Sequence, residues 1–361
     1  MAYEKSTAQL QKVHVTQTTK SPKERSWQSF LTIDVLYSAA LKTILHPFVA
    51  FMIPVSLRAV TVPYSNISMQ VSIAYATLLA FWWMLSVINK RVAFGLPREV
   101  DLDEEVIVIT GGSNGLGRLI ADFYAMRGAS VAVLDVAKRD DDDMMGLEFY
   151  RCDVGDRTQV EAAAAKLRKD LGVPTILINN AAVVNGKSIL DLSTEEVEKN
   201  FRVNLLSHYH TVQTFLPGML DAERGTIVTI ASVLGYLGCA NLSKAGLVAF
   251  HASLKAELSC SAHQGAEKIK TVLVTPGQLG TPMFGGLKTP STFLAPIVEP
   301  VELAKEIVSI VDSGWSGEVA LPLYSRLVPL LAALPSGIWT IGRAFSQMDK
   351  AMLDFSARRK S

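Results

Sequence analysis

The chain of 361 residues lacks several features that would assign it to particular protein classes. Its three cysteines, Cys152, Cys239 and Cys260, include no Cys-x-x-Cys pair, so we predict thiols in a reducing compartment and neither a disulfide framework nor a metal site. The net charge is only +1 and no long basic run occurs, so we expect no nucleic-acid partner. The first apolar run begins only near Phe30, so we expect no cleaved signal peptide.

Hydrophobic residues make up 49% of the chain and are unevenly distributed. A polar tail, residues 1–29, precedes them, and residues 67–89 then carry no charge over 23 positions. A helix of this length crosses a bilayer core of about 30 Å. Trp82 and Trp83 lie towards its end and Lys90 follows, which is typical of a span whose C-terminal end is cytoplasmic.

An earlier apolar segment, residues 35–57, is interrupted by Lys42, His46 and two prolines. It fits a second span, one arm of a kinked hairpin, or a helix lying in the membrane interface. Basic residues precede this segment, whereas the following loop offers only Arg58, which favours a hairpin with both ends in the cytoplasm. We therefore expect a membrane anchor over residues 30–91.

Residues 100–324 alternate short β-branched runs with helical patterns. Strands are expected over residues 106–110, 130–135, 148–152, 175–179, 226–231, 270–274 and 318–321. Helices are expected over residues 116–127, 157–171, 194–220, 244–262 and 300–312. This alternation predicts an α/β fold, a Rossmann-type doubly wound parallel sheet, with its ligand crevice at the carboxyl ends of the strands.

The first strand runs into the sequence TGGSNGLG, residues 110–117. Glycines there let the backbone turn tightly and approach a pyrophosphate, which then faces the N-terminus of the next helix. Asp135 ends the second expected strand, where a carboxylate accepts hydrogen bonds from a ribose diol and repels a 2′-phosphate. We therefore expect NAD as the cofactor. NADP stays an alternative because Lys138 and Arg139 lie nearby.

Several motifs, in order, resemble those of the short-chain dehydrogenases/reductases over about residues 105–324. Besides the glycine loop, they are Asp153 in RCDV, the run from Asn179 to Ala182, Asn204 in FRVNLL, Ser232 after IVTIA, and Pro276, Gly277 and Thr281 in TPGQLGTPM. Ala182 departs from the family pattern, which has glycine there. Within the family, the chain looks most like a membrane-anchored branch of 17β-hydroxysteroid and retinol dehydrogenase-like proteins.

The resemblance implies an oxidoreductase with a set of cofactor-binding residues. They are Thr110, Gly111, Ser113, Asn114, Gly115, Leu116, Gly117, Asp135, Asp153, Val154, Asn180, Ala181, Lys244, Pro276, Gly277 and Thr281. It also implies that Ser232, Lys244 and Asn204 are catalytic: the serine binds the substrate oxygen, the lysine binds the nicotinamide ribose, and the asparagine holds a proton-relay water.

The family's tyrosine, which moves the proton at the substrate oxygen, is missing. Tyr-x-x-x-Lys places the tyrosine on the same helix face as the lysine, whose charge lowers the tyrosine pKa. Here Ala240 lies four residues before Lys244. Ser232 and Lys244 are also 12 residues apart, which is shorter than the family spacing by roughly five. Tyr236 is a weak substitute, because Gly235 and Gly238 oppose a helix that would align it with Lys244.

Three interpretations of this gap stay open. The chain is a shortened variant of a working oxidoreductase, a natural pseudoenzyme that still binds dinucleotide, or a protein whose distorted loop weakens even cofactor binding. The apolar C-terminal extension, residues 325–361, is expected to be a lid, an interfacial helix, or a helix packed on the domain or on a partner subunit. Together with the anchor, this extension favours a lipophilic substrate (a sterol, retinoid or fatty alcohol). We expect a location in the endoplasmic reticulum or lipid-droplet membrane, with the catalytic domain in the cytosol. A homodimer is an open alternative.

Overall fold

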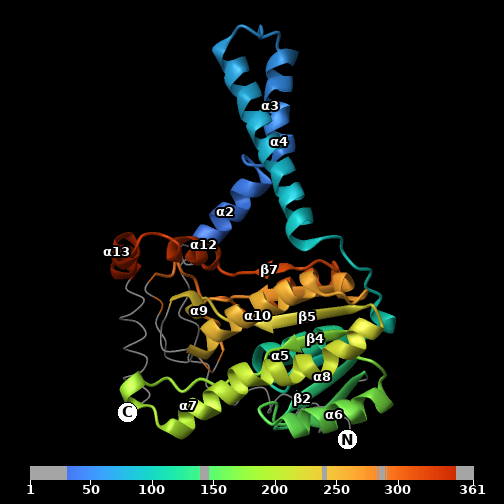
Figure 1. Ribbon diagram of the computed structural model, residues 1–361. Helices are drawn as coiled ribbons and strands as arrows, with labels where there is room; N and C mark the ends of the chain where they lie inside the picture. Colours follow the sequence, from blue (N-terminus) through green and yellow to red (C-terminus); the bar gives the residue numbers. More distant parts are fainter. Residues whose placement is uncertain are drawn as a thin grey trace, which may run out of the picture.

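A computed structural model describes residues 31–138, 146–237, 242–281, 283, 289 and 291–346. Its centre is a sheet of seven strands in the order β3-β2-β1-β4-β5-β6-β7, and every neighbouring pair is parallel (Figure 1). The strands are β1 (Val106–Thr110), β2 (Ser130–Asp135), β3 (Leu147–Arg151), β4 (Ile176–Asn179), β5 (Gly225–Ile230), β6 (Ile269–Val274) and β7 (Gly317–Val319). The Rossmann-type doubly wound sheet is therefore confirmed.

Helices cover both faces of this sheet. They are α5 (Gly115–Ala125), α6 (Arg157–Asp170), α7 (Thr194–Phe201), α8 (Ser207–Asp221), α10 (Leu242–Cys260) and α11 (Pro300–Asp312). Helices α5 and α11 pack on one face, and α6, α8 and α10 on the other. Because both faces are covered, the central strands are apolar throughout rather than alternating.

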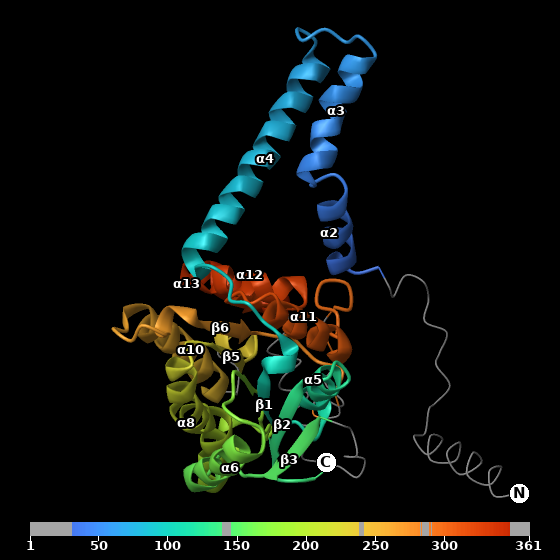
Figure 2. The same ribbon diagram turned by 90° about the vertical axis from the view of Figure 1, so that its right-hand side faces the viewer.

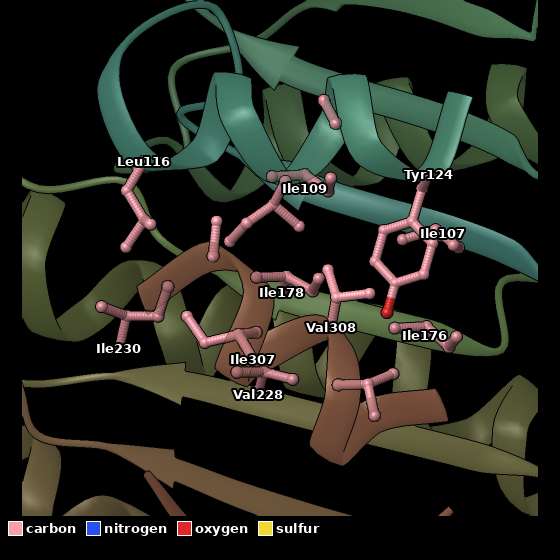
Figure 3. Packing of buried hydrophobic residues seen from close by; sticks show 14 of the residues in the cluster. Ile107, Ile109, Leu116, Tyr124, Ile176, Ile178, Val228, Ile230, Ile307 and Val308 are labelled. Carbon is pink, nitrogen blue, oxygen red and sulfur yellow. The ribbon is translucent and has the colours of Figure 1, made fainter. Parts of the chain in front are cut away.

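The core between the sheet and helices α5 and α11 is built largely from valines and isoleucines (Figure 3). Ile107 and Ile109 of β1 and Ile176 and Ile178 of β4 are all fully buried. Tyr124 of α5 closes this layer at one end, and its hydroxyl donates to Asp312 Oδ1 at 3.3 Å. Burial of each such side chain contributes about 1.5–3 kcal/mol, which makes the strands a rigid support for the loops at their ends.

The helix expected over residues 194–220 is divided. Helix α7 continues into a π-helical turn, Arg202–Leu206, and then into α8. Within the turn, Asn204 Oδ1 accepts from Val183 N at 2.7 Å and Asn204 Nδ2 donates to Val183 O at 2.9 Å. Single π turns in α-helices are frequent at functional sites, and here the turn lets one side chain pair with a loop backbone.

The last strand also differs from the expected residues 318–321, since β7 ends at Val319. Its backbone nevertheless remains bonded to the neighbouring segment, because Gly277 N donates to Leu321 O at 2.7 Å. Pro322 then has no N–H to continue the ladder. The strand is shorter than predicted, but it still positions the loop that follows β6.

The predicted anchor consists of α2 (Ile33–Lys42), α3 (Pro47–Ala59) and α4 (Ile67–Phe94), and α3 and α4 project together from the α/β domain (Figures 1 and 2). Among the described residues, α4 is the one helix long and apolar enough by itself to cross a membrane. Helices α2 and α3 meet at 51°. The residues 35–57 thus form a bent arm running antiparallel to α4, which matches the kinked-hairpin alternative.

The segment leaving the anchor is fixed to the sheet by Arg98. Its backbone N–H donates to Gly314 O at 2.9 Å, and its guanidinium Nη1 lies 2.7 Å from Glu105 Oε1. Both side chains are almost completely buried. Removing one partner of a buried ion pair costs about 3–5 kcal/mol, so Arg98 holds the anchor firmly on the domain.

Candidate active site

A cavity of about 640 Å³ opens at the carboxyl ends of the strands. Of the residues predicted from the sequence, it is lined by Gly111, Asn114, Gly115, Leu116, Asp135, Asp153, Val154, Asn180, Ala181, Ser232, Lys244, Pro276, Gly277 and Thr281. Ligands of doubly wound sheets bind at this edge. The structure therefore brings most of the predicted site into one cavity.

The glycine loop between β1 and α5 has room for backbone but not for side chains. Gly111 has a φ of +66°, and a Cβ there would lie 2.8 Å from Ala181 Cα. A Cβ on Gly117 would lie 2.4 Å from both Gly111 O and Asn180 Nδ2. Gly115 has a φ of +59° and open space around it, at the start of α5. These are the conditions under which a pyrophosphate reaches a helix N-terminus.

Asp135 lies at the end of β2 and anchors the same loop. Its Oδ2 accepts from Ser113 N at 3.0 Å, and its Oδ1 accepts from Ala137 N at 3.3 Å. Ser113 Oγ donates to Ala137 O at 2.6 Å. Ser113 is buried and does not line the cavity, so its contribution is to fix the turn that presents the Asp135 carboxylate.

Another predicted residue, Thr110, is buried behind the cavity wall and supports it. Thr110 Oγ1 accepts from Asn180 N at 3.0 Å and from Ala181 N at 3.1 Å. Asn180 Nδ2 donates back to Gly111 O at 2.9 Å. These bonds join the ends of β1 and β4, so the glycine loop and the Asn-Asn-Ala-Ala segment move as one unit.

Ser232 follows β5 and is held at the cavity by two backbone contacts. Its Oγ donates to Pro276 O at 3.4 Å and accepts from Leu234 N at 3.2 Å. The second contact fixes the start of α9 (Leu234–Leu237). The hydroxyl thus stands between the β5 and β6 loops, where it can turn towards a bound oxygen.

Lys244 reaches the cavity from the first turn of α10. Its Nζ donates to Ile230 O at 2.9 Å, and the residue is 8% exposed. It forms no ion pair with any carboxylate in the described part of the chain. Burial therefore lowers the pKa of the Lys244 ammonium to about 8. An amine with this pKa exchanges protons near neutral pH.

A polar cluster supports Lys244 from behind and was missed by sequence reasoning. Ser243 is fully buried; its Oγ donates to Asn200 Oδ1 at 2.7 Å and accepts from Asn204 Nδ2 at 3.2 Å. Asn204 does not itself line the cavity. The signal that could have found Ser243 is a small polar residue directly before the lysine. The cluster ties α10 to the π turn.

Tyr236 does not line the cavity. Its ring packs against the cluster of Val233, Leu237 and Val328, and burial raises its pKa. Cys239, and Ala240 four residues before Lys244, lie outside the described residues. His208 and His251 are buried, and burial lowers their pKa values to about 3 and about 4, so both are neutral at physiological pH.

The remaining cavity wall is mostly apolar, and most of its residues carry no motif that predicts a site. These residues are Leu134, Val136, Cys152, Ala182, Val183, Val184, Lys199, Val203, Ile230, Ala231, Leu234, Leu279 and Met283. Burial raises the pKa of the Cys152 thiol to about 12, so it is not a thiolate. The wall therefore favours an apolar ligand.

The described residues fit a nicotinamide dinucleotide. The glycine cradle fits its pyrophosphate, and the Asp135 carboxylate fits a ribose diol. Asp153 and Val154 line the region expected for the adenine, and Pro276, Gly277 and Thr281 line that expected for the nicotinamide. Ser232 and Lys244 then stand beside the reacting end.

Comparison with known proteins supports the same conclusion. Residues 105–291 match the family model described as short chain dehydrogenase. The chain is 31% identical to human retinol dehydrogenase 10 over 306 residues, covering 73% of this chain and 88% of that protein. It is 33% identical to "Uncharacterized oxidoreductase TDA5" of Saccharomyces cerevisiae over 261 residues, covering 69% and 78%.

A solved structure with the same fold is the ligand-free aldohexose dehydrogenase of Thermoplasma acidophilum. The TM-score is 0.52 at 22% identity, and the match covers 61% of this chain and 94% of that chain. At this identity the likeness concerns the fold.

Proposed function

Because the chain belongs to the short-chain dehydrogenase family, in its retinol and steroid dehydrogenase-like branch, we propose that it is built as a membrane-anchored oxidoreductase for a lipophilic alcohol or ketone. The observation that carries this proposal is the single cavity that gathers the glycine loop, Asp135, Ser232 and Lys244. A sterol, retinoid or fatty alcohol suits the apolar cavity wall, and relatives named retinol dehydrogenase 10 support this class.

NAD is the proposed cofactor, because Asp135 lines the cavity where a 2′-phosphate would lie. Lys138 is exposed just beyond the end of β2, where its positive charge could face a 2′-phosphate, so NADP is the alternative. When bound, the nicotinamide supplies the hydride acceptor or donor. The protein's own part is to bind the dinucleotide through the glycine loop and to orient the substrate oxygen through Ser232.

The chain lacks the tyrosine that would move the proton at the substrate oxygen. Ala240 stands where the family's tyrosine is expected, and Ser232 and Lys244 share no hydrogen bond with each other. Without a positioned acid, the rate falls by about 10²–10⁴-fold. We therefore expect severely impaired alcohol oxidation from the chain as it stands.

A second candidate function follows from this gap: a membrane-tethered pseudoenzyme that binds dinucleotide without turnover. The intact glycine cradle favours it, because nothing at that end of the cavity depends on the missing tyrosine. The anchor fits a cytosolic catalytic domain on the endoplasmic reticulum or lipid droplet, since Lys90 and Arg91 end α4. A homodimer remains compatible with either function.

The decisive experiment restores the missing segment. Five residues are inserted before Ser243 so that a tyrosine lies four positions before Lys244, and a matched insertion carries phenylalanine instead. All three proteins are given NAD and a retinoid or fatty alcohol in micelles, and NADH formation is followed. The proposal expects the protein with the tyrosine insertion to form NADH at least about 100-fold faster than the other two proteins.

Equal turnover by the phenylalanine insertion would show that the proton is handled elsewhere. Absence of turnover in all three, with NADH binding retained, would favour the pseudoenzyme. Sequencing the transcript across the codons for residues 240–244 separates a natural protein from a shortened variant.

A further inference from the structure

The C-terminal helices present an apolar face that the described catalytic domain leaves uncovered. They are α12 (Leu323–Ala332) and α13 (Ser336–Ser346). Val328 is buried against the domain, whereas Leu330 is 67% exposed and Ile341 is 59% exposed. We call this surface, with one neighbouring loop residue, the apolar collar: Leu294, Leu327, Leu330, Leu331, Ile338 and Ile341. Leu327, Leu330 and Leu331 share one face of α12 by their spacing, as Ile338 and Ile341 do on α13, and exposed apolar faces of this kind mark an interaction surface.

The collar lies at the base of the anchor. Figures 1 and 2 show α12 and α13 crossing the side of the catalytic domain from which α2 and α4 project. Lys90 Nζ, near the end of α4, lies 4.2 Å from the centroid of the Trp315 ring, so this end of α4 touches the domain. Basic residues at the end of a span mark the headgroup region. The same side of the domain therefore lies at headgroup depth.

Two hydrogen bonds join the collar elements to the first anchor helix. Leu323 N, at the start of α12, donates to Asp34 Oδ1 at 2.5 Å. Ile33 N donates to Phe293 O at 3.1 Å in the loop that carries Leu294. The collar is thus continuous with the anchor and is held to it at two points.

Charge also suits a lipid surface. Residues 319–346 contain no aspartate or glutamate and include Arg326 and Arg343. Interfacial helices combine an apolar face with basic residues, which are attracted to anionic headgroups. A second copy of this chain would bring the same positive charge to the contact.

We propose that the apolar collar is embedded in the same membrane leaflet that receives the anchor. Its occupant is the lipid surface, with the collar side chains at the boundary between headgroups and acyl chains. The catalytic domain then lies flat on the membrane instead of extending from a tether. This surface does not depend on which reaction the domain performs.

One consequence does rest on the proposed function. Leu237 of α9 packs against Val328 of α12, and Leu234 of the same short helix lines the cavity. Helix α9 therefore connects α12, which carries part of the collar, with the cavity wall. A lipophilic substrate would pass from the leaflet to the cavity without crossing bulk water.

The test measures how deeply the collar lies in the membrane. Membrane binding by itself would not test the proposal, because the anchor alone already holds the protein on a membrane. The full chain carries Cys260→Ser and Cys239→Ser, and the remaining Cys152 is buried. One labelling cysteine is introduced by Leu330→Cys or Ile341→Cys and labelled with an environment-sensitive fluorophore. Leu190→Cys is the matched control, since Leu190 is 97% exposed in the loop before α7. Each protein is reconstituted into phosphatidylcholine and phosphatidylserine vesicles with and without brominated acyl chains.

The proposal expects bromine to quench the labels at positions 330 and 341 several-fold more than the label at 190, with blue-shifted emission. Equal quenching at all three positions would overturn it. Cross-linking between labelled positions that rises with protein density, without bromine quenching, would assign the collar to a second copy and also overturn it.

Leu330→Glu with Ile341→Glu, probed through a third label at Leu327→Cys, should lose the quenching while NADH binding is unchanged. Loss of NADH binding as well would point to misfolding, in which case the single-label depths decide.

Discussion

The two ends of the cavity differ in how completely the described residues build them. At the dinucleotide end, Thr110, Asn180 and Asp135 fix the glycine loop through hydrogen bonds that cross from strand to strand. At the reacting end, Ser232 and Lys244 bond to separate backbone carbonyls, and the family's tyrosine is absent. The comparison predicts that a short missing segment removes the proton step while leaving the dinucleotide end of the cavity in place.

The largest expected effect concerns the free energy of unfolding, which the burial of the Lys244 ammonium lowers. Its pKa is about 8 in the folded protein against 10.5 in the unfolded chain, so at pH 7 both forms are protonated and the burial penalty is fully present. Between pH 8 and 10.5 the folded form loses this proton first, and stability rises. Relative to Lys244→Met, the free energy of unfolding should therefore increase by up to about 3 kcal/mol from pH 7 to 10.5.

Denaturant unfolding of the detergent-solubilised protein across this pH range measures the difference. Lys305→Met, at an exposed position of α11, is the control and should show a flat difference. A flat profile for Lys244→Met as well would mean that the ammonium is paired or hydrated in the folded protein.

Gly117→Ala should disrupt the dinucleotide end of the cavity. The new methyl group would meet Gly111 O and Asn180 Nδ2 at 2.4 Å, which forces the loop apart. Overpacking of this kind costs about 1–3 kcal/mol, so NADH should bind about 10- to 100-fold more weakly in a fluorescence titration. Gly337→Ala, where nothing lies within 4 Å of the new Cβ, should leave binding unchanged. Equal affinities for the two variants would remove the glycine loop from the cofactor site.

Asp135→Ala sharpens the assignment of the cofactor. Loss of the carboxylate removes both the ribose partner and the repulsion of a 2′-phosphate, so the preference for NADH over NADPH should fall by about 10-fold, or about 1.4 kcal/mol. Paired titrations with the two dinucleotides measure this ratio. An unchanged ratio would contradict the proposed position of the ribose.

Tyr236→Phe should have the smallest effect. The Tyr236 ring packs against a cluster that includes Val328 of α12, and it does not line the cavity. Loss of its hydroxyl should change NADH affinity and any residual turnover by less than about twofold, or about 0.4 kcal/mol. A tenfold fall in turnover with unchanged affinity would instead make Tyr236 the substitute acid.

The sequence predicted the dinucleotide end better than the reacting end for a physical reason. Glycines with positive φ and a carboxylate after a strand are local requirements, so Gly111, Gly115 and Asp135 could be assigned from spacing alone. The division of the helix at Asn204 could not, because it depends on pairing with Val183 across the fold. The packing of α12 on α9 is likewise a tertiary contact between apolar residues that carry no motif.

The most direct test of the central claim is a calorimetric titration of NADH into the full chain, without any inserted segment. An intact dinucleotide end predicts one saturable site with a Kd in the range of roughly 1 µM to 1 mM, and no detectable reduction of NAD by a lipophilic alcohol under the same conditions. Absence of saturable binding would show that the shortened segment distorts the whole cavity. Turnover at an ordinary rate would show that the missing tyrosine is not needed.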